Sequence, residues 1–250
     1  MRTRDEPVAI AVDGGRLGGT FVSPTRAMPG VLFVHGWGGD QHQYLTRARE
    51  IAALGSVCLT FDLRGHGGRH SEREGVTREE NLQDVLAAYD LLVEHHHVDP
   101  TAIAVIGSSY GAYLACILST RRSVRWLGLR APALYRDTGW HAPKQAIDRE
   151  DLHRYRSRRH APDENHALRA CRAFEGDVLL VESARDDIIP HAVIESYLDA
   201  CTRARSLTYR VLDGADHGLS EPAFQHAYTA LVATWLAEMF ERAPRRERGS

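Results

Sequence analysis

The residues most suited to chemistry are two serines that end an apolar run. Residues 103–116 read IAVIGSSYGAYLAC, and the segment 107–111 fits the pattern G-x-S-x-G. This pattern can place a nucleophilic serine on a strained turn between a strand and a helix. Such a serine needs small neighbours two residues before and two residues after it, and only Ser109, not Ser108, has glycine at both positions. Ser109 is therefore the candidate nucleophile, although a turn that merely needs small residues remains the alternative.

A serine hydroxyl is a weak nucleophile at neutral pH and needs a base. The chain has 14 histidines. His217 stands out because it lies among small residues, in LDGADHGLS, after the last β-like run and before the last helix-like segment. The run His95-His96-His97 is a poor metal site, since adjacent side chains diverge. We therefore expect His217 to be the base and expect no metal site.

A carboxylate should hold the imidazole in its reactive tautomer. The segment 178–190, VLLVESARDDIIP, places Asp186 and Asp187 in the loop after an apolar run. From the residues alone either aspartate could serve, and the other could be a turn or capping residue. The chain order is then serine, aspartate, histidine.

The elements that must position these residues alternate along the chain. The β-like runs are 8–12, 31–34, 57–61, 102–106, 124–129, 178–181 and 207–212. The helix-like segments are 43–54, 78–95, 110–121, 191–204 and 222–242. Continuously apolar runs are typical of strands that are covered on both faces. The alternation predicts an α/β fold, with a mainly parallel twisted sheet flanked by helices.

One long stretch breaks this alternation. Residues 132–173 hold prolines, histidines, arginines and scattered aromatics, and contain no β-like run. Connections of this length inside a compact domain are usually lids or binding segments. We expect one domain over residues 1–250, with 132–173 as a lid insertion and 243–250 as a disordered tail.

Composition excludes several other functions. The formal net charge is −2, so no strong field attracts nucleic acid or an anionic membrane. No Gly-Lys-Ser/Thr sequence forms a phosphate-binding loop, because Lys144 is the only lysine. The N-terminal residues lack a signal-like apolar run, and Cys58 and Cys116 lie in apolar runs as buried free thiols would. We expect a cytoplasmic protein without a cofactor, and composition does not indicate its oligomeric state.

Taken together, four motifs resemble those of the α/β-hydrolase superfamily. They are HGWGG at 35–39, DLRGHG at 62–67, the serine motif at 107–111, and the loops carrying Asp186 and His217. The resemblance runs from the strand before the first motif to the last helix. It implies an α/β-hydrolase fold, with the lid insertion following strand 6 of the sheet. The acid loop of these enzymes reads G-x-x-D-x-x-V-P, and SARDDIIP matches it at Asp186, with serine in place of the glycine.

The resemblance also assigns an oxyanion hole and a pocket. The backbone N–H groups of Trp37 and Tyr110 would bind the oxyanion, and the glycines around Trp37 would let the backbone approach the substrate closely. We expect Asp62 and the glycines of its motif to shape a nearby loop and not to take part in the chemistry. Tyr135 and Trp140 could line an acyl or aryl pocket, or could simply pack the insertion onto the core.

The chain is most similar to serine esterases and to dienelactone-hydrolase-like or acyl-peptidase-like enzymes. It departs from true dienelactone hydrolases, whose nucleophile is cysteine where this chain has Ser109. The resemblance implies a carboxylesterase-like hydrolase that cleaves a small-molecule ester or thioester through an acyl-enzyme. The alternatives are an acyl-peptide or amide hydrolase, and a non-catalytic binding protein on the same fold.

Overall fold

An eight-stranded sheet forms the centre of the computed structural model, which describes residues 4–13, 15–23 and 28–242. The strands are β1 (Arg4–Val12), β2 (Gly15–Ser23), β3 (Met28–Val34), β4 (Val57–Phe61), β5 (Val98–Ser108), β6 (Trp126–Arg130), β7 (Asp177–Arg185) and β8 (Ser206–Asp216). Their order across the sheet is β1-β2-β4-β3-β5-β6-β7-β8. The pairs β1–β2 and β2–β4 are antiparallel, and the pairs from β4 to β8 are parallel. The carboxyl ends of six neighbouring strands therefore meet at one edge of the sheet.

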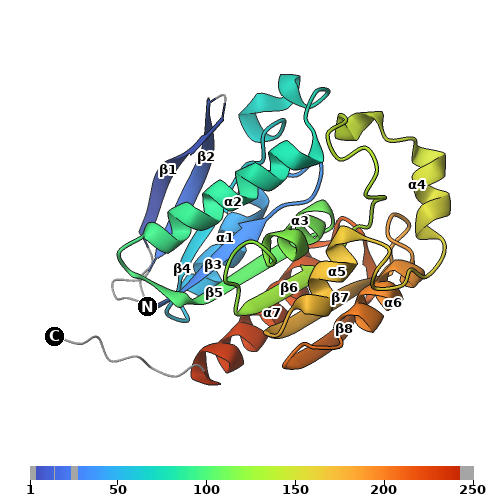
Figure 1. Cartoon of the computed structure of the whole chain (residues 1–250). Coiled ribbons are helices and arrows are strands. Elements are labelled where there is room, and N and C mark those ends of the chain that lie inside the picture. The colour runs from blue at the N-terminus through green and yellow to red at the C-terminus, as the bar shows by residue number, and fades with distance from the viewer. Residues whose placement is uncertain (1–3, 14, 24–27, 243–250) are drawn as a thin grey trace.

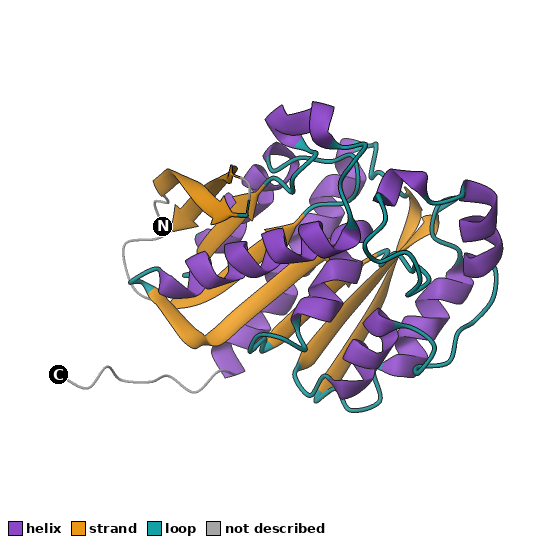
Figure 2. Cartoon of the chain, turned by 45° about the horizontal axis from the view of Figure 1, so that its top comes forward, coloured by secondary structure: helices purple, strands orange, loops and turns teal. Residues whose placement is uncertain are grey.

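Helices cover both faces of this sheet (Figure 1, Figure 2). The α-helices are α1 (His42–Ala52), α2 (Arg78–Glu94), α3 (Tyr110–Leu118), α4 (Arg149–Arg156), α5 (His166–Ala173), α6 (His191–Ala200) and α7 (Pro222–Arg242). Two short 3-10 helices, η1 (Gly67–Glu72) and η2 (Lys144–Ala146), lie in the connections. Helices α2, α3, α5 and α6 pack over one face, and α1 and α7 pack over the other.

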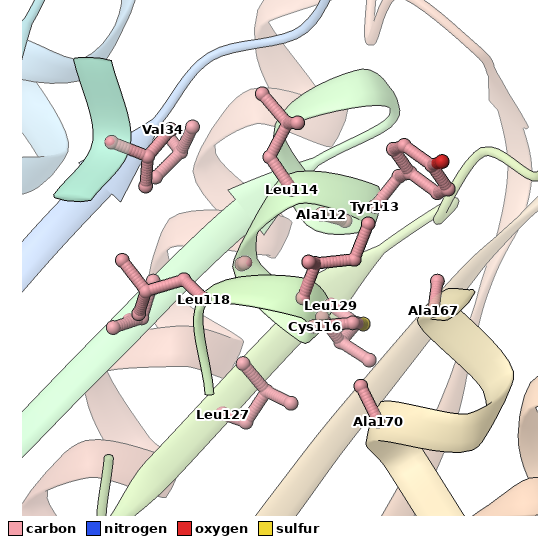
Figure 3. Close-up of a cluster of buried hydrophobic side chains, with 14 of the residues drawn as sticks. Val34, Ala112, Tyr113, Leu114, Cys116, Leu118, Leu127, Leu129, Ala167 and Ala170 are labelled. Carbon is pink, nitrogen blue, oxygen red and sulfur yellow. The ribbon is translucent and has the colours of Figure 1, made fainter. Parts of the chain in front are cut away.

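The core forms because the central strands bury side chains on both faces. All five residues of β4 and all five of β6 are buried. Figure 3 shows part of one face, where Leu127 and Leu129 of β6 belong to the same apolar cluster as Leu114 and Leu118 of α3. Continuously apolar strands are expected where helices cover both sides. The predicted fold class, a mainly parallel sheet flanked by helices, is confirmed.

The structure adds elements that the sequence did not predict. Strand β2 is absent from the predicted runs because its sequence, GRLGGTFVS, carries three glycines that obscure the apolar pattern. The segment 132–173 follows β6 and contains α4 and α5. Helix α5 packs in the helix layer with Leu168 and Cys171 fully buried, whereas α4 lies at the periphery of the molecule (Figure 1). A lid role for 132–173 stays a prediction, and the tail 243–250 lies outside the described residues.

Three further expectations concern the whole described chain. Across residues 4–13, 15–23 and 28–242, no helix is long and apolar enough to cross a membrane. Within the same residues, no group of three or more histidine, cysteine or acidic side chains could hold a metal ion. Cys58 and Cys116 are buried free thiols, as are Cys171 and Cys201.

Candidate active site

Ser109 stands on a strained turn at the carboxyl end of the sheet. Strand β5 ends at Ser108 and helix α3 begins at Tyr110, so Ser109 alone forms the connection. Its backbone has φ 52° and ψ −115°, a region that residues other than glycine rarely adopt. Strain of this kind persists only where the surrounding structure enforces it. The sharp turn separates Ser109, which is partly exposed, from Ser108, which is buried.

The two glycines of the motif make this turn possible. A Cβ on Gly107 would lie 2.5 Å from Cα of Ala112, and a Cβ on Gly111 would lie 2.2 Å from the carbonyl oxygen of Val34. Both distances are far inside van der Waals contact, and in both cases the obstructing atom is backbone. The requirement for small neighbours that selected Ser109 therefore has a direct steric cause.

His217 reaches Ser109 from the loop after β8. Its Nε2 accepts a hydrogen bond from the Ser109 hydroxyl at 3.1 Å. Asp216, the last residue of β8, shapes the loop by accepting hydrogen bonds from the backbone N–H of Ser220 at 2.8 Å and from its hydroxyl at 2.5 Å. Leu219 takes a positive φ of 52°, which completes the tight turn. The loop thus directs an imidazole over the carboxyl end of β5.

Asp186 completes the chain of hydrogen bonds. Its Oδ2 accepts the Nδ1–H of His217 at 2.7 Å. Its Oδ1 accepts the backbone N–H groups of Ile188 at 2.9 Å and of Ile189 at 2.8 Å. With a side chain that is only 4% exposed, Asp186 is held by three donors. Asp187 is exposed, and the imidazole is hydrogen-bonded to Asp186 and Ser109 instead, so the structure brings together Asp186, His217 and Ser109.

Two backbone N–H groups beside Ser109 are available to a ligand. Within the described part of the chain, neither Trp37 nor Tyr110 has a backbone acceptor for its N–H. Tyr110 is the first residue of α3, where the helix leaves such groups free. Gly36 lies against the serine, since a Cβ there would be 3.4 Å from Cβ of Ser109. The arrangement can present two donors to an oxyanion formed at Ser109.

His35 orders the loop that carries Trp37. Its side chain is 1% exposed, its Nδ1–H donates to the carbonyl of Gly36 at 2.8 Å, and its Nε2 accepts the N–H of Leu63 at 3.1 Å. Burial lowers the pKa of His35, which keeps the ring neutral with both nitrogens used. Neither nitrogen is left to take a proton from Ser109. His35 therefore positions the loop.

Asp62 has a similar structural role. Its carboxylate accepts the backbone N–H of Gln41 at 2.8 Å and the side-chain Nε2–H of the same residue at 3.1 Å. Gly67, with φ 56°, passes so close that a Cβ there would lie 2.4 Å from an oxygen of Asp62. The residues of the motif 62–67 shape the loop beside the site.

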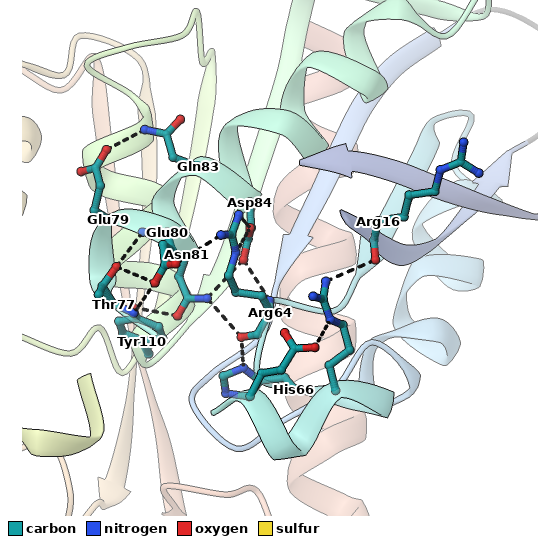
Figure 4. Close-up of polar contacts among 12 residues, drawn as sticks. Arg16, Arg64, His66, Thr77, Glu79, Glu80, Asn81, Gln83, Asp84 and Tyr110 are labelled. Carbon is teal, nitrogen blue, oxygen red and sulfur yellow. Dashed lines mark hydrogen bonds and ion pairs between the residues drawn. The ribbon is translucent and has the colours of Figure 1, made fainter. Parts of the chain in front are cut away.

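A buried polar network supports the ring of Tyr110 (Figure 4). The Tyr110 hydroxyl donates to Oδ1 of Asn81 at 3.1 Å, and Asn81 Nδ2 donates to Asp84 at 3.2 Å. Arg64 then binds Asp84 through its backbone N–H at 2.9 Å and its Nε at 2.8 Å. The network ties α2 and the loop at 62–67 to the first residue of α3.

The two residues proposed for a pocket lie in different surroundings. Tyr135 is 4% exposed, contacts the rings of Tyr110 and Tyr113, and lines a cavity of about 240 Å³. Trp140 does not line this cavity, and its indole N–H donates to Glu79. The Trp140 ring lies against Tyr113 with centroids 6.4 Å apart. Of the two, Tyr135 alone lines this cavity.

Sequence reasoning missed the cations around Tyr135. Arg78, Lys144 and Arg156 lie within 5.7 Å of the centroid of its ring. They come from α2, η2 and α4, and no spacing pattern in the sequence connects them. The one available signal was Lys144 itself, the single lysine in a chain that otherwise uses arginine.

Known proteins resemble this chain in sequence and in structure. A model of the prolyl oligopeptidase family matches residues 42–243. An uncharacterized protein of Mycobacterium tuberculosis is 31% identical over 210 residues, which cover 82% of this chain and 69% of that protein.

Solved structures share the fold at low sequence identity. Est1E of Butyrivibrio proteoclasticus, solved with ferulic acid bound, is 18% identical with a TM-score of 0.73, covering 94% of this chain and all of that one. A dienelactone hydrolase of Anabaena variabilis is 20% identical with a TM-score of 0.64, covering 95% of this chain and 99% of that one.

An acylaminoacyl peptidase of Pyrococcus horikoshii is 16% identical with a TM-score of 0.71. The match covers 99% of this chain but 43% of the peptidase, so this chain corresponds to one part of that longer protein. All three structures share the fold described above. Because the family model also matches most of the sequence, the chain belongs to the prolyl oligopeptidase family, within the α/β-hydrolase superfamily.

Proposed function

We propose that this protein is a serine hydrolase that cleaves a carboxylic ester or thioester through an acyl-enzyme. The observation that carries the proposal is the continuous hydrogen-bonded chain from Asp186 through His217 to Ser109. These are the residue types and the contacts that activate a serine hydroxyl. The free N–H groups of Trp37 and Tyr110 support it further.

The reaction follows from these contacts. Ser109 Oγ attacks the ester carbonyl while His217 Nε2 takes its proton, and the carbonyl oxygen becomes an oxyanion held by the two N–H groups. The C–O bond to the leaving group breaks as His217 returns the proton to that oxygen. Water then attacks the acyl-Ser109 ester, with His217 again as the base, and releases the acid. Asp186 keeps Nδ1 protonated, so that Nε2 remains the acceptor.

Labelling of the serine tests this proposal directly. A fluorophosphonate should label the wild-type protein and should not label Ser109→Ala. p-Nitrophenyl esters of graded acyl length would then define the preferred acyl group. A protein that neither reacts with the probe nor hydrolyses any ester would instead be a binding protein on this fold.

Amide cleavage is the second candidate, and the family match favours it. The matching model is that of the prolyl oligopeptidase family, and an acylaminoacyl peptidase shares the fold. The same hydrogen-bonded chain can protonate an amine leaving group. Comparing p-nitrophenyl esters with the p-nitroanilides of the same acyl groups separates the two candidates, because an esterase loses most of its kcat/KM on the anilide.

A further inference from the structure

Lys144 places its ammonium group among three aromatic rings beside the candidate active site. Its Nζ lies 3.9 Å from the ring centroid of Trp37, 4.9 Å from that of Tyr110 and 5.3 Å from that of Tyr135. Trp37 and Tyr110 are the two residues whose backbone N–H groups are the candidate oxyanion donors. The only lysine of the chain therefore lies against the side chains of both.

Backbone contacts hold the Lys144 segment in this position. The Lys144 N–H donates to the carbonyl of Val76 at 2.8 Å. The preceding residue, Pro143, forms an isolated antiparallel bridge with Thr77. Thr77 in turn caps α2 through a reciprocal pair of hydrogen bonds with Glu80. Lys144 is thus fixed to the rigid start of α2.

Two arginines approach the same tyrosine from other elements. The Arg78 guanidinium carbon lies 5.7 Å from the Tyr135 centroid and that of Arg156 lies 4.8 Å from it. Arg78 is 1% exposed and Arg156 is 6% exposed. Arg78 donates to the carbonyls of Arg136 and Thr138, both at 2.6 Å, and its buried Nε has no hydrogen-bond partner.

Arg156 is bound to carbonyl groups and also interacts with the Tyr135 hydroxyl. Its Nε donates to the carbonyl of Leu134 at 3.0 Å, and its Nη1 donates to that of Ile188 at 3.4 Å. Among the described residues, no carboxylate forms an ion pair with Arg78, Lys144 or Arg156.

Three acidic side chains of this region have other partners. Glu79 accepts the indole N–H of Trp140, and Asp151 pairs with Arg136 at 3.0 Å. Asp148, which also lines the cavity, accepts the N–H of Asp151 at 2.7 Å and so caps α4. Buried cations are ordinarily paired with an anion, because removing an unpaired charge from water is costly. Three cations without a carboxylate therefore leave a positive charge that a ligand can neutralise.

The ionisation of the surrounding groups agrees with this excess of positive charge. Burial by itself raises the pKa of the Tyr135 phenol, but Lys144 and Arg156 outweigh burial and bring the pKa below its ordinary value. Burial lowers the pKa of Lys144, and Arg156 and Arg78 lower it further, although Tyr135 opposes them. The shift of Tyr135 comes from the neighbouring positive charges, whereas that of Lys144 comes first from burial and only then from the two arginines.

The cluster borders a cavity on one side. This cavity of about 240 Å³ is lined by Arg78 and Tyr135, but not by Lys144 or Arg156. The backbone links Tyr135 to the serine, since the N–H of Ala133, two residues earlier, donates to the carbonyl of Ser109 at 3.0 Å. Tyr135 thus lies two residues beyond a direct backbone contact with the candidate nucleophile.

We propose that Arg78, Lys144 and Arg156 form a subsite that binds a carboxylate at the far end of the substrate's acyl group. The substrate class is then a monoester of a short dicarboxylic acid. The assignment of the acyl group rests on the proposed hydrolase function, but the anion subsite itself can be tested without turnover.

Matched substrates test the specificity. Mono-p-nitrophenyl adipate and p-nitrophenyl hexanoate have acyl chains of equal length and differ in the terminal carboxylate. The wild type should favour the adipate in kcat/KM. Lys144→Met, which keeps the length of the side chain but removes its charge, should lower the adipate-to-hexanoate ratio by about tenfold or more, the loss expected for a bond between charged groups. Lys144→Arg should retain the preference.

The control variant removes a positive charge from the surface. Arg154 is 67% exposed and lies on α4, so Arg154→Gln changes the net charge equally without touching the subsite. Its ratio should match that of the wild type. Equal ratios in the wild type and Lys144→Met, or equal losses in Lys144→Met and Arg154→Gln, would overturn the subsite.

Binding measured without turnover separates this subsite from the hydrolase proposal. Monomethyl adipate, titrated calorimetrically into Ser109→Ala, should bind at least tenfold more tightly than dimethyl adipate, and adding Lys144→Met should abolish the difference. If no ester were hydrolysed but this difference remained, the subsite would stand and the hydrolase proposal would fail. If esters were hydrolysed but the two adipates bound equally, the subsite would fail alone.

Discussion

Gly111 lies directly against the backbone of Val34, and this contact sets the position of the candidate nucleophile. A Cβ on Gly111 would be 2.2 Å from the Val34 carbonyl oxygen and 2.5 Å from that of His35. The start of α3 is therefore pressed onto the end of β3. This close approach brings Gly36, in the loop after β3, into contact with Ser109. The nucleophile and one of its two candidate oxyanion donors are thus placed by the same contact.

Gly111→Ala tests this close approach. The obstructing atoms are backbone, so α3 and β3 must move apart, and we expect a loss of at least about 1–3 kcal/mol in the free energy of unfolding. Urea unfolding would measure it. Gly68→Ala is the matched control, because a Cβ there meets nothing within 4 Å, and its stability should change by less than about 0.5 kcal/mol. Equal free energies of unfolding for the two variants would show that α3 and β3 can move apart without loss of stability.

The sequence predicted the parts of this site that depend on local geometry. The two glycines around Ser109, the small residues around His217 and the loop position of Asp186 are local features, each visible in a few residues. These loops meet because parallel strands bring their carboxyl ends to one edge of the sheet. The one local ambiguity, Asp186 or Asp187, was resolved by the family pattern, and the structure brings Asp186 to the imidazole.

The features that the sequence did not predict depend on distant contacts. Strand β2 is rich in glycine and forms because β1 and β4 supply partners on both sides. Helix α5 is short, and it is buried only because α3 and α6 lie beside it. Arg78 and Arg156 resemble surface arginines in the sequence, and only the fold removes them from solvent.

Ser109→Ala should lower the kcat/KM of an activated ester by about 10⁴-fold or more, because it removes the attacking atom. The far-ultraviolet circular dichroism spectrum should not change. Ser108→Ala should have a much smaller effect, since the Ser108 hydroxyl is buried and accepts a hydrogen bond from Nε of Arg130 at 3.3 Å. Equal losses of activity from the two substitutions would contradict the choice of Ser109.

Asp186→Asn should depress kcat by about 10³–10⁴-fold, because an amide cannot hold the reactive tautomer of His217. Asp187→Asn should leave kcat within a few-fold of the wild type, since Asp187 is exposed and away from the imidazole. Steady-state kinetics on one p-nitrophenyl ester would compare them. The reverse order of effects would mean that Asp187 supplies the acid in solution.

His217→Gln and His35→Gln should fail in different ways. His217→Gln removes the base and should eliminate nearly all turnover while the protein remains folded. His35→Gln disturbs a buried ring that binds Gly36 and Leu63, so it should lower the free energy of unfolding by about 1–3 kcal/mol. Kinetics and urea unfolding on both variants would test this. An inactive His35→Gln beside a fully active His217→Gln would overturn the assignment of the base.

His66 should make the stability of the protein depend on pH. Its ring is 1% exposed, its Nδ1–H donates to the carbonyl of Arg64 at 3.1 Å, and its buried Nε2 has no partner. Burial, aided by the neighbouring His35, lowers its pKa from 6.5 to about 3.

Above the unfolded-state pKa of 6.5, His66 is neutral in both states and its stabilising contribution is complete. As the pH falls below that value, His66 becomes protonated in the unfolded chain. In the folded protein it stays neutral until the pH approaches its lowered pKa of about 3. The folded state should lose about 2 kcal/mol by about pH 5, at roughly 1.4 kcal/mol per pH unit. Urea unfolding at pH 7.5 and pH 5 should therefore show a smaller difference in His66→Gln than in the wild type. Equal differences would mean that His66 takes up its proton without cost, as an exposed histidine does.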